Sequence, residues 1–386
     1  MIHPFLRKNI INLFIFSMKR RYIFYSYKNS NIISGKNLKF YDIPKLLIKK
    51  IFFLRLKKCM KLNIFHEKDV LAIPPYGLPI TKRGQIVLSP FHTSSRKIFI
   101  RTLRYLGLKS FLKIYLTFIF CNRYERKEKS VFFLIPRHGY KHNSPNYCHW
   151  MTENLPQIRS LAFLNPNTKI LVNQNLKKYQ NESLKYLDKI LEPRKIIKYD
   201  NKPTFIKNLY FSSIEDQVYG PLENIQNSDP YSRLWIRDKI ISAKNFKIYT
   251  NSEKIFVMRD PKERRQIINF EDFKTILNKY NFQLYQPGIN GFENDVKKFN
   301  RCKIVLGLNG AGLVNILFMR NGHLIELIPS CKSHDYWFST LSKELKHIKY
   351  HRFECDDRKN INSNEDVEID LIEFEKKLTS ILAEID

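Results

Sequence analysis

Short apolar runs alternate with longer amphipathic stretches along most of the chain. Several of the short runs are apolar on both sides, which is typical of buried parallel strands. They predict strands at Gln85–Leu88, Val131–Ile135, Lys169–Val172, Lys195–Tyr199, Asn208–Ser212, Lys254–Met258, Phe282–Tyr285, Lys303–Gly307 and Leu324–Ile328. The stretches between and after them predict helices at His149–Leu164, Leu176–Leu191, Tyr231–Phe246, Glu271–Tyr280, Glu293–Arg301, Gly312–Met319, Tyr336–Leu345 and Leu371–Ile385.

This strand–helix alternation indicates an α/β fold built from βαβ units. The elements form two sets, one before and one after the helix predicted at 231–246. We therefore predict two Rossmann-like domains that face a cleft, at 76–230 and 231–386, the second closed by the C-terminal helix. The longest nearly apolar runs, Ile10–Met18 and Tyr115–Cys121, are shorter than the roughly 18 residues of a membrane-spanning helix.

Positive charge is concentrated near the start of the chain. The 386 residues hold 67 Lys+Arg and 36 Asp+Glu, a net charge of +31, and residues 1–130 hold 28 basic and only 5 acidic residues. We predict a basic leader at 1–75 that associates with an anionic membrane surface, followed by a turn at Pro74–Pro79. The alternative is compositional drift, because Lys, Asn, Ile and Phe are the residues that an AT-rich genome favours.

The six cysteines are scattered and form no Cys-x-x-Cys pair. This spacing suggests neither a zinc site nor a redox motif and fits a reducing compartment. We predict a cytoplasmic protein that is peripheral at the membrane.

The first candidate for chemistry is the segment Val305–Phe318, where an apolar strand runs into a small-residue turn and then a helix. Gly310 and Gly312 allow the backbone to approach a ligand closely and to adopt positive φ. The N–H groups at the start of the helix suit a pyrophosphate. The alternative is a tight turn with no ligand.

A second candidate is Glu326, a carboxylate among apolar residues in the strand-like segment Gly322–Pro329. Such a charge must lie at a strand end or be paired. At the end of a nucleotide-binding strand it commonly accepts hydrogen bonds from ribose hydroxyls. The alternative is a salt-bridged structural glutamate.

The third candidate is the pair His149 and Glu153 in the segment Asn146–Pro156. Their i,i+4 spacing puts both on one face of a helix. Such a pair can act as an oriented base or a charge-assisted dyad, although a single pair of this kind is also common as a structural contact.

The fourth candidate lies in Lys254–Asn269, where a strand delivers Arg259 at its carboxyl end and Arg264 and Arg265 follow in a loop. Clustered guanidinium groups at a strand end are suited to clamp phosphate. The alternative is a solvated basic loop.

Together these segments resemble the family-61 glycosyltransferases, over about Asn146 to Pro329. The matching features are Asn-Tyr-x-His-Trp-x-x-Glu-x-Leu-Pro, a strand ending in Arg with a downstream Arg-x-Ile-x-Asn, then Gly-Ala-Gly-Leu-x-Asn, then Ile-Glu-Leu. The resemblance implies a two-domain GT-B-like fold, an inverting mechanism and a nucleotide-sugar donor. Two positions depart from the family pattern: Asn309 replaces the usual His before Gly-Ala-Gly, and Phe270 replaces the Glu after Asn269.

We therefore predict an inverting transferase that moves a sugar from a nucleotide sugar, UDP-linked, to a glycan, lipid-linked or other hydroxyl acceptor in polysaccharide, capsule or glycoconjugate synthesis. Glu153 beside His149 is the predicted base, and the reverse assignment stays open. The predicted nucleotide-sugar site comprises Arg259, Arg265, Asn269, Asn309, Gly310, Ala311, Gly312, Asn315 and Glu326. No Asp-x-Asp pair is present, so the sequence requires no metal and no further cofactor.

Two other functions compete with this prediction. A non-enzymatic basic protein that binds nucleic acid or another polyanion is supported by the charge alone, and no nucleic-acid motif is recognisable, so nucleic acid is not an expected partner. An inactive transferase-like scaffold is suggested by Asn309, because an asparagine cannot carry a proton.

Overall fold

The computed structural model describes residues 31–33, 63–84, 86–87, 95–121, 126–134, 147–187, 191–192, 194–199, 202–213, 230–243, 252–261, 265–330, 337–356 and 366–385. Most of the predicted leader and Arg264 lie outside these residues. Of the strand predicted at 85–88, Ile86 and Val87 are described, and Ile86 forms an isolated bridge with Ile80.

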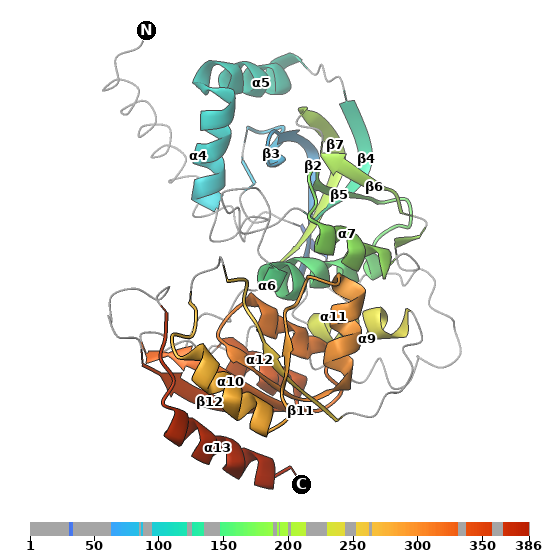
Figure 1. Cartoon of the computed structure of the whole chain (residues 1–386). Helices are drawn as coiled ribbons and strands as arrows, with labels where there is room; N and C mark the ends of the chain where they lie inside the picture. Colours follow the sequence, from blue (N-terminus) through green and yellow to red (C-terminus); the bar gives the residue numbers. More distant parts are fainter. Residues whose placement is uncertain are drawn as a thin grey trace, which may run out of the picture.

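The first half of the chain is built on a seven-stranded mixed sheet (Figure 1). Its strands follow the order β1 (Asn31–Ile33), β2 (Asn63–Ile73), β7 (Thr204–Ser213), β4 (Arg126–Phe133), β5 (Lys169–Asn173) and β6 (Ile196–Tyr199), and β3 (Leu78–Thr81) pairs with β2. The strands from β7 to β6 are parallel, whereas β2 is antiparallel to each of its neighbours. The strands predicted at 131–135, 169–172, 195–199 and 208–212 are confirmed.

The early part of this sheet was not predicted. Strand β2 falls inside the range 1–75 that we expected to be a leader, and it pairs with β7 from Asn63 to Ala72. Its centre carries His66-Glu67-Lys68-Asp69, which hides the apolar pattern of a strand. Residues 74–77 form the turn between the antiparallel strands β2 and β3. Helices α4 (Ser95–Leu106) and α5 (Leu108–Cys121) then cover this end of the sheet (Figure 1).

The second half is built on a five-stranded, fully parallel sheet. Its order is β12 (Ile348–Cys355), β11 (Gly322–Pro329), β10 (Cys302–Leu308), β8 (Glu253–Val257) and β9 (Gln283–Tyr285). The chain therefore starts at β8, adds β9 on one side, and then crosses to β10 on the other. This reversal between β8 and β10 is a topological switch point, where α/β proteins bind ligands beyond the carboxyl ends of the strands.

Side chains alternate between the two faces of the second sheet, as strand geometry requires. Val257 and Val305 pack on one face with α11 (Phe292–Arg301), the 3₁₀ helix η5 (Ala311–Phe318) and α12 (Trp337–Leu345). Phe256 and Leu306 pack on the other face with α10 (Phe270–Lys279) and α13 (Leu371–Ala383). These helices and strands β8 to β11 agree with the prediction, whereas β12 was missed because polar residues interrupt it.

The helix predicted at 149–164 is not a regular helix. It consists of a short α-helical turn α6 (Tyr147–His149), a π-helical turn η2 (Trp150–Asn154) and a 3₁₀ helix η3 (Leu155–Phe163). Pro156 lacks a backbone N–H and cannot continue an α-helical ladder, which explains the change of helix type. The helix predicted at 176–191 is shorter, as α7 (Lys178–Lys185), and α9 (Pro230–Ser242) connects the halves.

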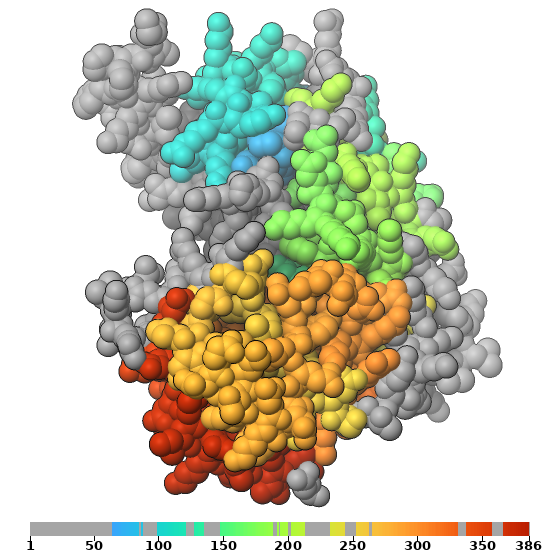
Figure 2. All heavy atoms as spheres, in the orientation of Figure 1, coloured from blue at the N-terminus to red at the C-terminus, as the bar shows by residue number. Residues whose placement is uncertain are grey.

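The two halves pack on one another through a shared core. Trp150 and Ile170 of the first half belong to the same buried cluster as Val305 and Phe318 of the second. Helix α6 of the first half contacts η5 of the second, and α7 contacts α11, so the two halves are packed together in the middle of the molecule (Figures 1 and 2). Within the part of the chain that the structure describes, no helix has both the length and the apolar character needed to cross a bilayer.

Candidate active site

A cavity of about 700 Å³ lies where the two halves meet. The first half lines it with Tyr147, Lys178, Tyr179 and Glu182. The second half contributes the carboxyl ends of β8 and β10, together with residues 286–288. The cavity is therefore at the switch point of the second sheet, the position that the topology marks for a ligand.

Two arginines line this cavity and converge on one residue. Arg259 follows β8, and its Nη1 donates to the backbone oxygen of Asn309 at 3.4 Å. Arg265 donates from Nη1 to the same oxygen at 2.7 Å and to the Asn309 side-chain oxygen at 3.0 Å. The structure thus brings together the two arginines that the sequence suggested as a phosphate clamp. Paired guanidinium groups at a cavity wall suit a bidentate anion.

Asn309 connects Arg265 to a buried carboxylate. Its Nδ2 donates to Glu326 Oε1 at 2.7 Å, and the hydroxyl of Tyr350 donates to Glu326 Oε2, also at 2.7 Å. Glu326 is 1% exposed, stands in the middle of β11 opposite Gly307, and does not line the cavity. Glu326, which we predicted to bind the ribose, therefore lies behind the cavity wall. There it fixes the orientation of the Asn309 amide.

The glycines of the turn at residues 310–312 leave room for neighbouring side chains and do not serve to adopt unusual backbone angles. Gly310 is extended, with φ −179°, and neither Gly310 nor Gly312 has the positive φ that we expected. A Cβ on Gly310 would overlap the guanidinium of Arg259, and one on Gly312 would press against Val257 and Pro287. Gly310, Ala311 and Gly312 all line the cavity, with Ala311 at the start of η5.

A hydrogen bond across the two halves joins Tyr147 to Asn315. The Tyr147 hydroxyl donates to Asn315 Oδ1 at 2.5 Å, and Asn315 Nδ2 donates to Gly312 O at 3.1 Å. Burial raises the pKa of Tyr147 well above its usual range. Asn315 is buried and holds the glycine turn in place, and Tyr147, which the sequence analysis did not select, lines the cavity. Its place in the same motif as His149 was the available signal.

His149 and Glu153 form a buried dyad. Their side chains are 5% and 1% exposed, and Nδ1 of His149 lies 2.5 Å from Oε1 of Glu153. The π-helical turn brings the two side chains together, and Gln157 Nε2 donates to the backbone oxygen of Glu153 at 3.0 Å. The predicted pairing is thus present. Neither side chain lines the cavity, although Tyr147 of the same helical segment does.

Asn269 is engaged elsewhere. Its Nδ2 donates to the backbone oxygen of Ile369 at 2.8 Å, and its Oδ1 accepts from the Ile369 N–H at 3.1 Å. This two-way contact anchors residues 366–370 beside α10, and Asn269 does not line the cavity. The structure does not bring Asn269 to the other predicted nucleotide ligands, because a backbone partner 100 residues away uses both ends of its amide.

An acidic residue that sequence reasoning missed, Asp295, also lines the cavity. Its Oδ1 accepts from the Tyr285 hydroxyl at 2.7 Å, and the Gly288 N–H donates to both carboxylate oxygens at 3.1 and 3.0 Å. Burial raises the pKa of Asp295 to about 6, partly opposed by these hydrogen bonds. Its position inside α11 gave no sign of a site in the sequence.

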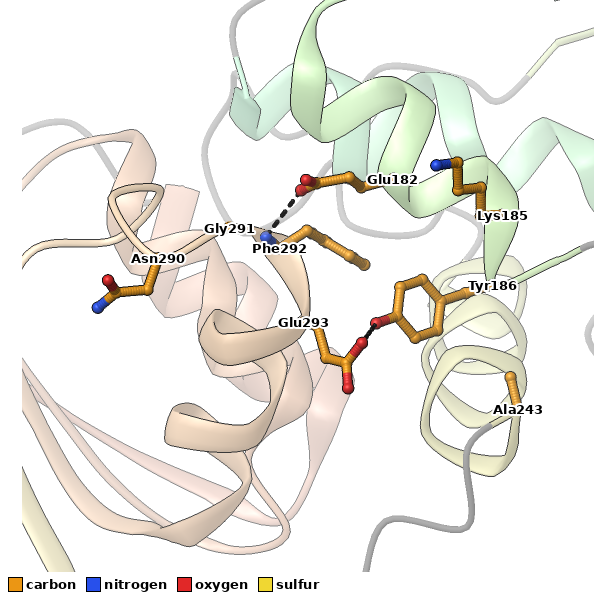
Figure 3. A pocket seen from close by; sticks show the side chains of 8 residues that line it. All are labelled: Glu182, Lys185, Tyr186, Ala243, Asn290, Gly291, Phe292 and Glu293. Atoms are coloured by element: carbon orange, nitrogen blue, oxygen red, sulfur yellow. Dashed lines mark hydrogen bonds between the residues drawn. The ribbon is translucent and has the colours of Figure 1, made fainter.

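Two smaller hollows adjoin the main cavity. A slot of about 270 Å³ lies beside Arg259 and Arg265 and is lined mainly by apolar side chains, among them Met258, Ile267 and Phe270. A polar hollow of about 460 Å³ shares Glu182, Gly291 and Phe292 with the main cavity. Figure 3 shows Tyr186 donating to Glu293 across it, and Glu182 accepting from the N–H of Phe292 at the start of α11. Among the described residues, no three His, Cys, Asp or Glu side chains are grouped to hold a metal ion.

These features define an α/β protein whose second half is Rossmann-like, with an arginine-lined cavity at its switch point. Residues 147–325 match the model of the family Glycosyltransferase 61, and this part of the chain belongs to that family. The family resemblance is thereby confirmed, and the matched range contains the dyad, both arginines and the glycine turn and ends one residue before Glu326. No curated protein matches the chain.

Proposed function

We propose that the protein is an inverting glycosyltransferase of the GT-B-like type, which uses a nucleotide-sugar donor and a hydroxyl acceptor. One observation carries this proposal: Arg259 and Arg265 meet at Asn309 in a cavity that lies at the switch point and between the two halves. A donor diphosphate needs such a pair of cations, and an acceptor needs access from the opposite half.

The donor fits the second half as follows. Arg259 and Arg265 hold the diphosphate, and the close approach of backbone at Gly310 to Gly312 lets the phosphates lie against the start of η5. The apolar slot next to the arginines takes the base, for which uracil is our proposal. Glu326 and Asn315 act as positioning residues, since each is buried and bonded to a neighbour of the turn.

Transfer proceeds by one displacement. The acceptor oxygen attacks the anomeric carbon opposite the diphosphate, the new C–O bond forms, and the bond to the diphosphate breaks with its electron pair leaving on oxygen. The two guanidinium groups stabilise that growing negative charge. The acceptor proton passes to the dyad of His149 and Glu153. Because neither side chain lines the cavity, this step requires a path from the cavity to the dyad that opens when the acceptor binds.

Within the dyad, two assignments are open from the sequence, and the contact supports one of them. Glu153 faces Nδ1 of His149, which is how a carboxylate orients an imidazole so that Nε2 takes the proton. We therefore propose His149 as the base and Glu153 as its orienting partner. The alternative has Glu153 as the base.

The acceptor in this proposal is a glycan or a lipid-linked sugar, and the process is polysaccharide, capsule or glycoconjugate synthesis in the cytoplasm at the membrane. Its support is the family and the basic character of the first third of the chain. The alternative function, non-enzymatic binding of a polyanion, is supported by that same charge, and no contact in the site adds support for it.

The test is a panel of nucleotide sugars, read first by thermal shift and then by donor hydrolysis and transfer. We expect one nucleoside diphosphate sugar to raise the melting temperature and to be turned over, with inversion visible in the anomeric proton signals of the product. A protein that is stabilised by a nucleotide sugar and turns none over would be the inactive scaffold. Indifference to the whole panel would overturn the proposal.

A further inference from the structure

Helix α5 has one face packed and one face exposed. Phe111 and Phe118 are buried in the first-half core, and Tyr115 packs against it. The Tyr115 hydroxyl donates to the backbone oxygen of Gly84 at 2.9 Å, and Lys82 Nζ donates to that of Phe118 at 2.5 Å. The inner face is thus held firmly on the turn that follows β3.

The outer face is a continuous stripe. Lys109, Lys113, Leu116 and Phe120 are all exposed, at a spacing of four, three and four residues, which places them along one side of the helix. Leu116 is 48% and Phe120 is 75% exposed. One end of the stripe is therefore cationic and the other is apolar. Tyr105, at the end of α4, is exposed as well.

Charge complementarity identifies the partner of this stripe. Residues 95–121 contain six Lys or Arg and no Asp or Glu, so the helix pair offers no anion to a cationic or neutral protein partner. Exposed apolar side chains next to lysines are the composition of helices that lie in an anionic bilayer interface. The helix pair is at the opposite end of the molecule from α13 (Figure 1). The main cavity lies where the two halves meet, and none of the described residues that line it belongs to α4 or α5.

We propose that the outer face of α5 docks the protein on an anionic lipid surface, with Lys109 and Lys113 at the lipid phosphates and Leu116 and Phe120 entering the headgroup region. The inference concerns a surface and does not depend on the reaction in the cavity. Membrane association, which the sequence predicted for residues 1–75, is thereby assigned to helix α5 as well.

Co-sedimentation of the full chain with vesicles tests the proposal. We expect binding to vesicles of phosphatidylcholine mixed equally with phosphatidylglycerol, weak binding to phosphatidylcholine alone, and loss of binding at high salt. The variant Leu116→Ser/Phe120→Ser should reduce the partition coefficient about tenfold, and Lys109→Glu/Lys113→Glu by a similar factor. Donor hydrolysis should be unchanged in both variants, because neither touches the cavity.

Ile372→Ser is the matched control. Ile372 is 85% exposed on α13, at the other end of the molecule, so its replacement should leave vesicle binding intact. Unchanged binding by both α5 variants would overturn the proposal, as would an equal loss in the Ile372 variant. A dimer in solution that the α5 variants dissociate, without vesicle binding by the wild type, would also overturn it and identify a second copy as the partner.

Discussion

The side-chain amide of Asn309 donates a hydrogen bond to the buried carboxylate of Glu326, with 2.7 Å between Nδ2 and Oε1. Since the carboxylate can only accept here and Arg265 can only donate, the two partners fix which way the amide points. Tyr350 holds the second carboxylate oxygen. The position that departs from the family pattern is therefore part of a hydrogen-bond network that links Arg265, Asn309, Glu326 and Tyr350.

Exchanging the two functional groups tests this network. Asn309→Asp places a second carboxylate against that of Glu326. Glu326→Gln turns an amide N–H toward a neighbouring hydrogen-bond donor. Each change should raise the KM for the nucleotide sugar about tenfold and lower the melting temperature. The double variant restores every contact with one hydrogen bond reversed. We expect it to recover most of both losses, a coupling of about 2 kcal/mol. Strictly additive losses in KM and melting temperature would contradict the network.

Gly310 and Arg259 should behave as one unit. In Gly310→Ala the new Cβ occupies the place of the guanidinium, so the arginine must leave the cavity wall. We expect the donor KM to rise about tenfold or more, as for Arg259→Ala, because a charge-assisted contact is lost in either case. The double variant should be no worse than either single one. Gly312→Ala should raise the KM less, because its Cβ would meet only Val257 and Pro287. Additive effects of Gly310→Ala and Arg259→Ala would show that these two residues act independently.

The sequence was most informative where interactions are local or strands are buried on both faces. The strands around the glycine turn and the two arginines were predicted correctly for this reason. Partners far away in the chain decided the rest: Asn269 pairs with Ile369, and Glu326 is held by Tyr350 from a strand that was missed. Periodicity cannot show which buried polar group meets which, so the roles of these residues needed the structure.

The dyad can be tested by separating chemistry from binding. Glu153→Gln and His149→Gln should each lower kcat by about 10² to 10⁴, since proton removal from the acceptor is lost or disordered. A thermal shift by the donor should persist in both, because neither residue lines the cavity. If His149 is the base, its variant has the lower kcat of the two. Wild-type turnover of either variant would remove that residue from the mechanism.

The apolar slot offers a pair of neighbouring isoleucines, one that lines the slot and one that does not. Ile267 lines the slot, whereas Ile268 does not and is 52% exposed. Ile267→Trp should fill the space proposed for the base and raise the donor KM about tenfold, with kcat at saturation little changed. Ile268→Trp is the control and should leave both parameters unaltered. An equal KM for the two variants would place the base outside this slot.

Asp295 makes stability depend on pH in a defined direction. Its pKa is about 6 in the folded protein and near 3.8 in an unfolded chain, so between these values the folded state holds more protons. The contribution of Asp295 to the free energy of unfolding should therefore fall as pH rises from about 4 to 6, by at most about 3 kcal/mol, and this contribution should not change further above that range. Asp295→Asn lacks this titration and can still accept from Tyr285. Urea unfolding of both proteins at the two ends of the range measures the difference, and parallel pH dependence would show that Asp295 titrates normally.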